Sequence, residues 1–73
     1  MHADLNWDVV KGKWKQLRGK AKEEWGDITD DDWDQIDGHK DKLVGKLQER
    51  YGYEREEAER HAHEKVSAWN SEA

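Results

Sequence analysis

The chain has 73 residues, of which 42% are charged and 33% hydrophobic, and its formal net charge is −5 at pH 7. This length allows one domain, and the lack of cysteine excludes disulfides and thiolate metal sites. A net acidic chain is a poor general binder of polyanions, and without an apolar run long enough for a transmembrane span or a signal peptide it is expected in the cytoplasm.

The composition points in two directions on whether the chain folds. The mean hydropathy of −1.43 and the high charge are typical of disorder. Five tryptophans and a regular apolar period favour a folded domain whose thin core is built largely from aromatic rings. We therefore predict a single folded domain over residues 1–73, with a core over about residues 6–69 and loose termini.

The first segment, residues 7–25, reads as one amphipathic helix. Its apolar residues recur in steps of three and four, which places them on one face. Asn6 is the predicted N-cap, and Gly26 is the predicted left-handed residue after the helix. The apolar face consists of Trp7, Val10, Trp14, Leu17, Ala21 and Trp25.

This segment recurs in the second half of the chain as an internal repeat. Residues 7–26 align without gaps on residues 33–52, a shift of 26 positions, and eight of the 20 aligned positions are identical. A period of this length suggests two related supersecondary units packed on each other. The alternative is that two amphipathic helices resemble each other by chance.

The second unit has one gap in its apolar stripe, because Lys40 stands where the first unit has Trp14. We predict a short helix over about residues 30–37, a kink, and a longer helix over about residues 40–51 that ends at Gly52. One continuous kinked helix is the alternative. The stripe consists of Trp33, Ile36, Leu43, Leu47 and Tyr51.

An aspartate-rich run precedes the second unit. Ile28 fits a hydrophobic residue just before a cap, Thr29 fits the cap, and the aspartates then fill the first turn, where the helix dipole favours negative charge. Calcium binding is the competing interpretation, because aspartates alternate at positions 30, 32 and 34. An EF-hand needs glycine and glutamate where Gln35 and Asp41 stand, so no metal site is predicted.

The last segment, residues 54–69, is predicted to be a helix that packs closely on a bulky partner, plausibly the tryptophans of the first helix. Its acidic residues come early and Lys65 comes late, as the helix dipole favours. Residues 70–73 are expected to fray. The apolar face consists of Ala58, Ala62, Val66 and Trp69.

Two glycines inside the first predicted helix are unexpected, because each costs about 1 kcal/mol relative to alanine in a helix interior. Gly12 and Gly19 lie on the outer face of the first unit, and Gly38 and Gly45 repeat them in the second. They are either tolerated surface residues, or places where a backbone or a ligand approaches the helix or where the helix must loosen.

We find no catalytic constellation, no cofactor motif and no metal-ligand spacing, so the sequence predicts a protein that is not an enzyme. Ser67 and Ser71 lie near the expected frayed end. His61 and His63 are two residues apart on a helix and point to different faces, so we expect them to pair with surface glutamates rather than to bind metal.

The charges are segregated along the chain. Residues 8–22 carry six basic side chains and one acidic one, whereas residues 27–37 carry six aspartates and no base. We expect the basic stretch to pair with this acidic stretch or with water. Four of its residues share one helical flank, and this basic row is the candidate contact for nucleic acid or an acidic protein. The basic row consists of Lys11, Lys15, Arg18 and Lys22.

The sequence over about residues 6–60 resembles the CsbD-like family of small bacterial stress-response proteins. The most specific matches are the Asn6-Trp7 start, the Gly12 to Trp14 step, the run LVGKLQ at residues 43–48, and Tyr51-Gly52-Tyr53. Trp33 departs from the pattern, since the family more often has an aliphatic residue there, and this is expected to thicken the core.

The resemblance implies an all-α fold, a small bundle of three to four helices in which two helical hairpins pack orthogonally, as in SAM-like bundles. It implies a general stress-response protein and supplies no catalytic residues. Two functions follow as expectations: a hydrophilic protectant without enzymatic activity, or a small module that binds a partner through the basic row. A monomer or weak self-association through faces of opposite charge is expected.

Overall fold

The computed structural model describes residues 5–72, and within them the chain forms five α-helices and no strand. This confirms the all-α class, with more helices than the three or four expected. The helices are α1 (Trp7–Gly12), α2 (Trp14–Glu24), α3 (Asp30–Ile36), α4 (Lys40–Tyr51) and α5 (Arg55–Glu72).

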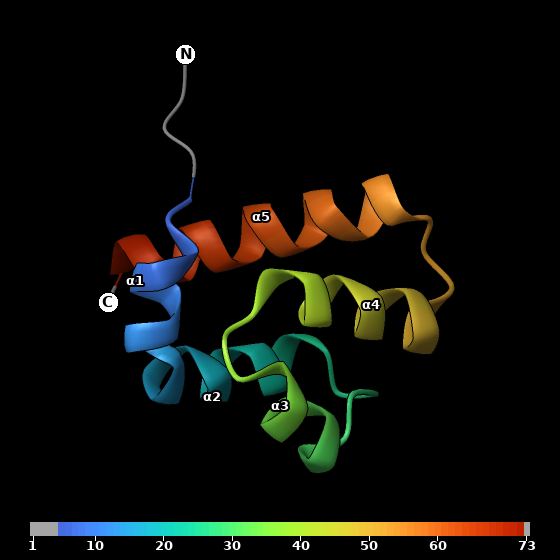
Figure 1. Cartoon of the computed structure of the whole chain (residues 1–73), viewed down its shortest axis with the longest axis horizontal. Helices are drawn as coiled ribbons and strands as arrows, with labels where there is room; N and C mark the ends of the chain where they lie inside the picture. Colours follow the sequence, from blue (N-terminus) through green and yellow to red (C-terminus); the bar gives the residue numbers. More distant parts are fainter. Residues whose placement is uncertain (1–4, 73) are drawn as a thin grey trace.

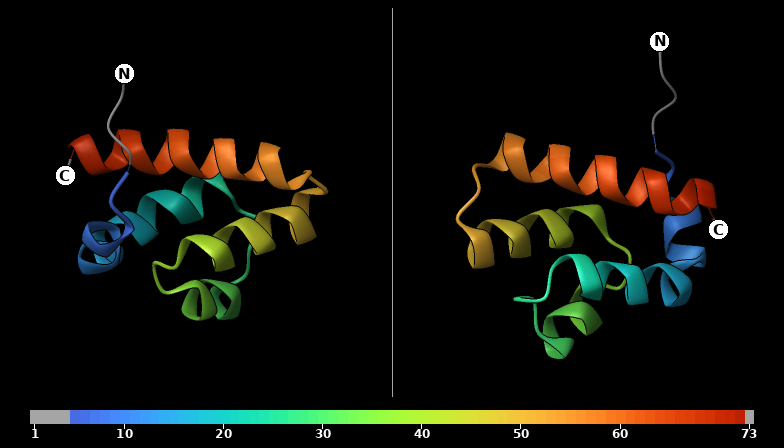
Figure 2. Two further views of the ribbon diagram at one scale, coloured as in Figure 1. Left: turned by 45° about the horizontal axis from the view of Figure 1, so that its top comes forward. Right: turned by 180° about the vertical axis from the view of Figure 1, so that it is seen from behind.

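The helices lie in three tiers (Figures 1 and 2). The long helix α5 covers one side, α2 and α4 lie beneath it, and α3 closes the opposite side. The helix α5 contacts both α4 and α2, while α3 contacts α4 and α1 contacts α2. The description as two orthogonal, SAM-like hairpins stays a prediction.

The prediction of a single helix over residues 7–25 is wrong, because the chain turns at Lys13. This residue has φ −104° and ψ 12°, and it ends α1 and caps α2. Gly12 precedes it, and glycine is among the poorest helix formers. The turn leaves Val10 at the end of α1 and Trp14 at the start of α2 both buried, so the apolar stripe continues across it.

The second unit also consists of two helices, as predicted. The helix α3 ends at Ile36, its C-cap Asp37 is left-handed with φ 45°, and Gly38 follows with φ 80°. The next helix begins at Lys40, the residue that the alignment of the two units pairs with Trp14 at the start of α2. Each unit is thus a short helix, a break and a longer helix.

Three of the predicted helix ends agree with the structure, and the end at Gly26 does not. The Asn6 side chain accepts a hydrogen bond from the Asp8 amide, Thr29 caps α3, and Gly52 is left-handed at the end of α4. Gly26 is not left-handed, because the chain already leaves the helix at Trp25, whose φ is −120° and whose side chain is buried.

The predicted fraying after residue 69 is wrong for residues 70–72, because α5 runs on to Glu72. Residue 73 lies outside the described residues. The helix is held along its length by small apolar residues that let it approach its neighbours closely. Ala58, Ala62 and Val66 are fully buried, and Trp69 is half-buried.

Aromatic rings form a continuous chain through the core. The ring centroids lie 6.0 Å apart for Trp14 and Trp33, 6.4 Å for Trp33 and Trp25, and 5.5 Å for Trp25 and Trp69. Trp33, the departure from the family pattern, is the largest fully buried side chain. The rest of the buried core is Val10, Leu17, Ala21, Ile28, Ile36, Leu43, Val44, Leu47, Ala58, Ala62 and Val66.

Candidate functional site

The basic row does not form one continuous face. Lys11 belongs to α1, and the turn at Lys13 separates it from Lys15, Arg18 and Lys22 on α2. The i, i+4 spacing that joined Lys11 to the others holds only within one uninterrupted helix. The structure therefore brings together three of the four predicted contact residues.

Two of these residues already bind the acidic helix α3. The Arg18 guanidinium lies 2.9 Å from an Asp34 carboxylate oxygen, and the Lys22 ammonium lies 2.8 Å from one of Asp30. The expectation that the basic stretch pairs with the chain's own acidic stretch is confirmed for both. Lys15 is exposed, and within residues 5–71 neither it nor Lys11 forms an ion pair.

These two ion pairs are exposed to solvent. The aspartate side chains are 73% exposed for Asp30 and 66% for Asp34, so each pair is screened and exchanges readily with other ions. The hydrogen bond from Lys22 and its positive charge lower the pKa of Asp30 from its ordinary value of 3.8. Asp30 is therefore ionised at neutral pH and forms an ion pair with the Lys22 ammonium.

Lys11 lies against the break of the second unit. A methyl group added at Gly38 would meet the Lys11 Cα and Cγ at 2.9 Å, so only glycine fits there. The close approach considered for the recurring glycines is thus real at Gly38. Gly12, Gly19 and Gly45 have open space around the position of a Cβ.

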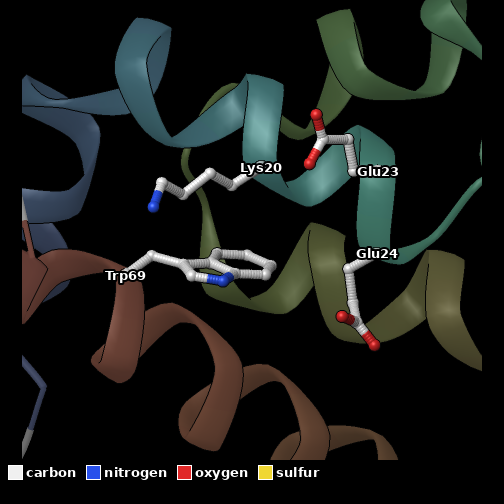
Figure 3. A pocket seen from close by; sticks show the side chains of 4 residues that line it. All are labelled: Lys20, Glu23, Glu24 and Trp69. Atoms are coloured by element: carbon white, nitrogen blue, oxygen red, sulfur yellow. The ribbon is translucent and has the colours of Figure 1, made fainter.

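A surface hollow of about 570 Å³ lies between α2 and α5. Figure 3 shows Lys20, Glu23 and Glu24 extending from α2 and the Trp69 indole extending from α5 toward it. Glu24 also lies 3.6 Å from Lys65. The tryptophan chain of the core therefore reaches the surface between charges of both signs.

A second hollow of about 320 Å³ lies between α3 and α4. Gly45 lines it together with Lys46 and Glu49, and its missing side chain leaves part of this space open. The alignment of the two units pairs these residues with Gly19, Lys20 and Glu23, so each unit carries a hollow over the same part of its longer helix.

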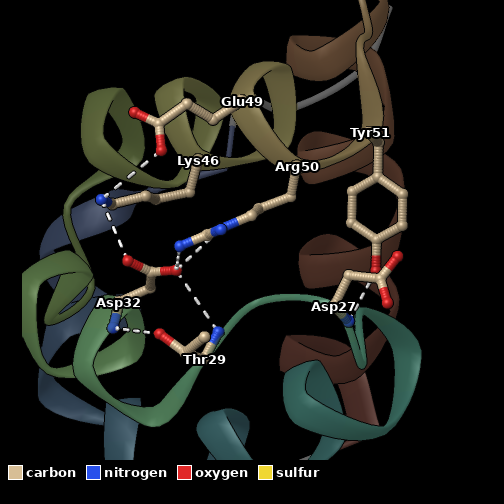
Figure 4. A network of polar contacts seen from close by, with 7 residues as sticks. All are labelled: Asp27, Thr29, Asp32, Lys46, Glu49, Arg50 and Tyr51. Carbon is tan, nitrogen blue, oxygen red and sulfur yellow. Dashed lines mark hydrogen bonds and ion pairs between the residues drawn. The ribbon is translucent and has the colours of Figure 1, made fainter.

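The most buried charge in the described chain is Asp32, which is 4% exposed (Figure 4). The amide of Asp32 donates to the Thr29 hydroxyl, and the amide of Thr29 donates to the Asp32 carboxylate, which forms a capping box at the start of α3. The Arg50 guanidinium lies 2.8 Å from Oδ2, the same carboxylate oxygen that accepts from the Thr29 amide, and the Lys46 ammonium lies 3.1 Å from Oδ1. One carboxylate thus ties the start of α3 to α4.

The surroundings of Asp32 keep it ionised. The hydrogen bond from Lys46 lowers its pKa most, burial opposes this, and the bonds from Arg50 and Thr29 lower it further. The pKa therefore falls well below 3.8. All three aspartates of the calcium interpretation, at positions 30, 32 and 34, bind side-chain cations instead.

A stack of rings joins the end of α4 to α5. Tyr51 stacks on Tyr53 at 5.6 Å, and Tyr53 stacks on His61 at 4.6 Å. The Tyr51 hydroxyl also accepts a hydrogen bond from the amide of Asp27 (Figure 4). His61 thus packs on a tyrosine ring, and the surface pairing that the sequence suggested does not describe its main contact.

Sequence reasoning missed the cluster around Asp32. Its one available signal was the pattern Thr-x-x-Asp, which marks a reciprocal cap. Nothing in the sequence places Lys46 and Arg50 against it, because that contact depends on how α3 and α4 pack. Among residues 5–71, no three histidines or carboxylates lie where they could hold a metal ion together.

Fold and surface together define a small, highly charged helical-bundle protein. None of its described helices is long and apolar enough to cross a membrane. The CsbD-like family profile matches residues 8–60, and the chain belongs to the CsbD-like family, a family of general stress-response proteins.

Curated relatives extend over most of the chain. The UPF0337 protein PA4738 of Pseudomonas aeruginosa is 62% identical over 55 residues, which cover 75% of this chain and 85% of the relative. The UPF0337 protein YjbJ of Escherichia coli K12 is 55% identical over 56 residues, which cover 77% of this chain and 81% of the relative.

Proposed function

We propose that this protein is a non-enzymatic protectant that acts in the cytoplasm, where its hydrophilic surface shields other macromolecules during stress. Membership of the CsbD-like family supports the role in stress. The composition supports the mode of action, because 42% of the residues are charged and the mean hydropathy is −1.43.

The observation that carries the proposal is how completely the apolar residues are withdrawn from the surface. Within residues 5–71, Val9 is the one large hydrophobic side chain that is exposed, at 40%. Contiguous exposed apolar patches favour association, whereas a charged surface far from neutrality keeps a protein soluble. Such a molecule can accumulate between other proteins without sticking to them.

The test is protection of a labile enzyme through drying and rehydration. The enzyme is dried with micromolar amounts of this protein or of a helical control protein of the same size and net charge, and its recovered activity is measured. We expect a larger recovered fraction with this protein. Equal recovery with the control would contradict a protective role beyond that of any charged protein.

A second candidate function is binding of a polyanion through α2. The segregated charge favours it, because Lys15 is exposed and Arg18 and Lys22 lie beside it on the same helix. Titration of labelled DNA and RNA at low and moderate salt tests this function. A flat titration at low salt would contradict it, because phosphate binding strengthens as salt is removed.

A further inference from the structure

Two carboxylates of α3 bind cations of α2 that would otherwise be available to the phosphates of a nucleic acid. Asp34 binds Arg18 at 2.9 Å and Asp30 binds Lys22 at 2.8 Å. The Cβ atoms of residues four apart on a helix are about 5–6 Å from each other, so the two carboxylates present neighbouring negative charges on one face of α3. Of the three basic-row residues on α2, Lys15 is the one that is exposed without a carboxylate partner among residues 5–71.

The partner that fits this surface is a single-stranded nucleic acid. Lys15, Arg18 and Lys22 lie within eight residues of one helix, and the seven steps from the first to the last cover about 10 Å at 1.5 Å per residue. Cations in such a row can contact successive phosphates of one strand, and phosphate contacts require no base-specific geometry. The hydrogen-bonding atoms of Arg18 and Lys22 are already directed at anions.

We propose that α3 is a built-in competitor, whose Asp30 and Asp34 hold Arg18 and Lys22 and so weaken the binding of single-stranded nucleic acid to α2 in the native chain. The inference rests on the second candidate function. The helix itself need not move, because Trp33 and Ile36 anchor it in the core. Only the exposed carboxylate contacts exchange for phosphates, and exposed ion pairs exchange at little cost.

The test compares two double variants of equal charge. Asp30→Asn/Asp34→Asn frees the α2 cations, whereas Asp27→Asn/Asp31→Asn removes two charges from exposed aspartates of the same acidic stretch that form no ion pair within residues 5–71. Binding of a fluorescein-labelled 20-nucleotide oligodeoxythymidine is measured by anisotropy at several salt concentrations. Circular dichroism melts verify that both variants are folded.

We expect the first variant to bind about 10-fold more tightly than the second at low salt. Each phosphate contact on a single strand adds about 0.7 to the slope of log affinity against log salt, so two freed cations should steepen the slope by about 1.4. A further Arg18→Gln/Lys22→Gln change in the first variant should remove both gains.

The possible failures have different meanings. Equal affinity and equal slope for the two double variants would overturn the competitor while leaving binding by α2 in place. If no variant binds the oligonucleotide, both the competitor and the second candidate function are contradicted. Tight binding of an acidic peptide by the first variant, without binding of DNA, would overturn the assignment of nucleic acid as the partner.

Discussion

The two units of this chain share a plan and differ in how they are stabilised. Each has a short helix, a break and a longer helix, and the longer helices begin at the equivalent residues Trp14 and Lys40. The first unit breaks at Lys13 in an ordinary region of φ. The second breaks through two left-handed residues, Asp37 and Gly38. The same alternation of helix and break therefore arises from different local chemistry.

The starts of the two units differ as well. Asn6 caps α1 alone, whereas its counterpart in the second unit, Asp32, completes a capping box and also binds Lys46 and Arg50 of α4. The first unit supplies more of the aromatic core, and the second supplies the buried polar network. The comparison teaches that a similar apolar spacing accompanies a similar order of helices in the two segments, while their polar contacts differ.

The largest expected effect on stability comes from the aligned positions 14 and 40, where the first unit has a tryptophan and the second has a lysine. Trp14→Ala should destabilise the protein by about 3–5 kcal/mol, because it removes a 5% exposed indole that contacts Trp33. That loss is comparable with the whole stability of so small a domain. Lys40→Ala, at the equivalent exposed position, should change stability by no more than about 0.5 kcal/mol. Urea unfolding followed by circular dichroism measures both, and similar effects would contradict the division.

The next effect separates two equivalent glycines. Gly38→Ala should destabilise by about 2 kcal/mol or more, because alanine opposes a φ of 80° and its methyl would meet the Lys11 backbone at 2.9 Å. Gly12→Ala should stabilise by about 0.5 kcal/mol, because its position is helical and open. Chemical denaturation should therefore give a lower free energy of unfolding for Gly38→Ala and a higher one for Gly12→Ala. A loss at both positions would show that the first break also depends on glycine.

The third effect depends on pH. Asp32→Asn should destabilise more than Thr29→Ala, which removes one cap at a cost of about 1 kcal/mol. The pKa of Asp32 lies below 3.8 in the folded state, so its contribution is fully present above the unfolded pKa and is lost as pH falls through the folded one. The difference between the native chain and Asp32→Asn should therefore shrink as pH is lowered from 5 toward 2.

Urea midpoints at several pH values measure this difference. The matched control is Asp31→Asn, which changes an exposed aspartate in the same turn of α3. It should leave the acid dependence of the native chain unchanged. A constant gap between the native chain and Asp32→Asn from neutral to acid pH would show that the ionised carboxylate contributes nothing to the fold.

The apolar spacing predicted most of the fold because burial acts on every turn of a helix. The stripes from Val10 to Trp25 and from Trp33 to Leu47 are buried as expected, and so are Ala58, Ala62 and Val66. Helix ends were harder to predict, because Gly26 could have ended α2 but the buried Trp25 ended it first. Local preference gives way where tertiary packing decides the direction of the chain.

The candidate site was predicted only in part, because it depends on contacts between helices. Charge segregation correctly indicated that Arg18 and Lys22 have partners within the chain. It did not show that the turn at Lys13 removes Lys11 from the row. Residue types along a helix can be read from a sequence, but a turn of one residue changes which of them share a surface.

The smallest expected effect concerns the two glycines that the packing does not explain. Gly19 and Gly45 are exposed inside α2 and α4, with no atom within 4 Å of the Cβ position. Alanine there should stabilise the protein by about 0.5–1 kcal/mol at each site. The two changes should be additive unless the two sites are coupled. Thermal melts of the two single variants and of the double variant measure this.

The Gly19 and Gly45 variants also test whether the two units respond alike at aligned positions where both have glycine. Gly45 borders the hollow over α4, and its counterpart Gly19 directly precedes a residue of the hollow over α2. Equal gains, with protection of the dried enzyme unchanged, would mean that both glycines are tolerated surface residues. A gain in stability together with lost protection would instead show that the protein uses the open space over these helices or the backbone freedom of the glycines.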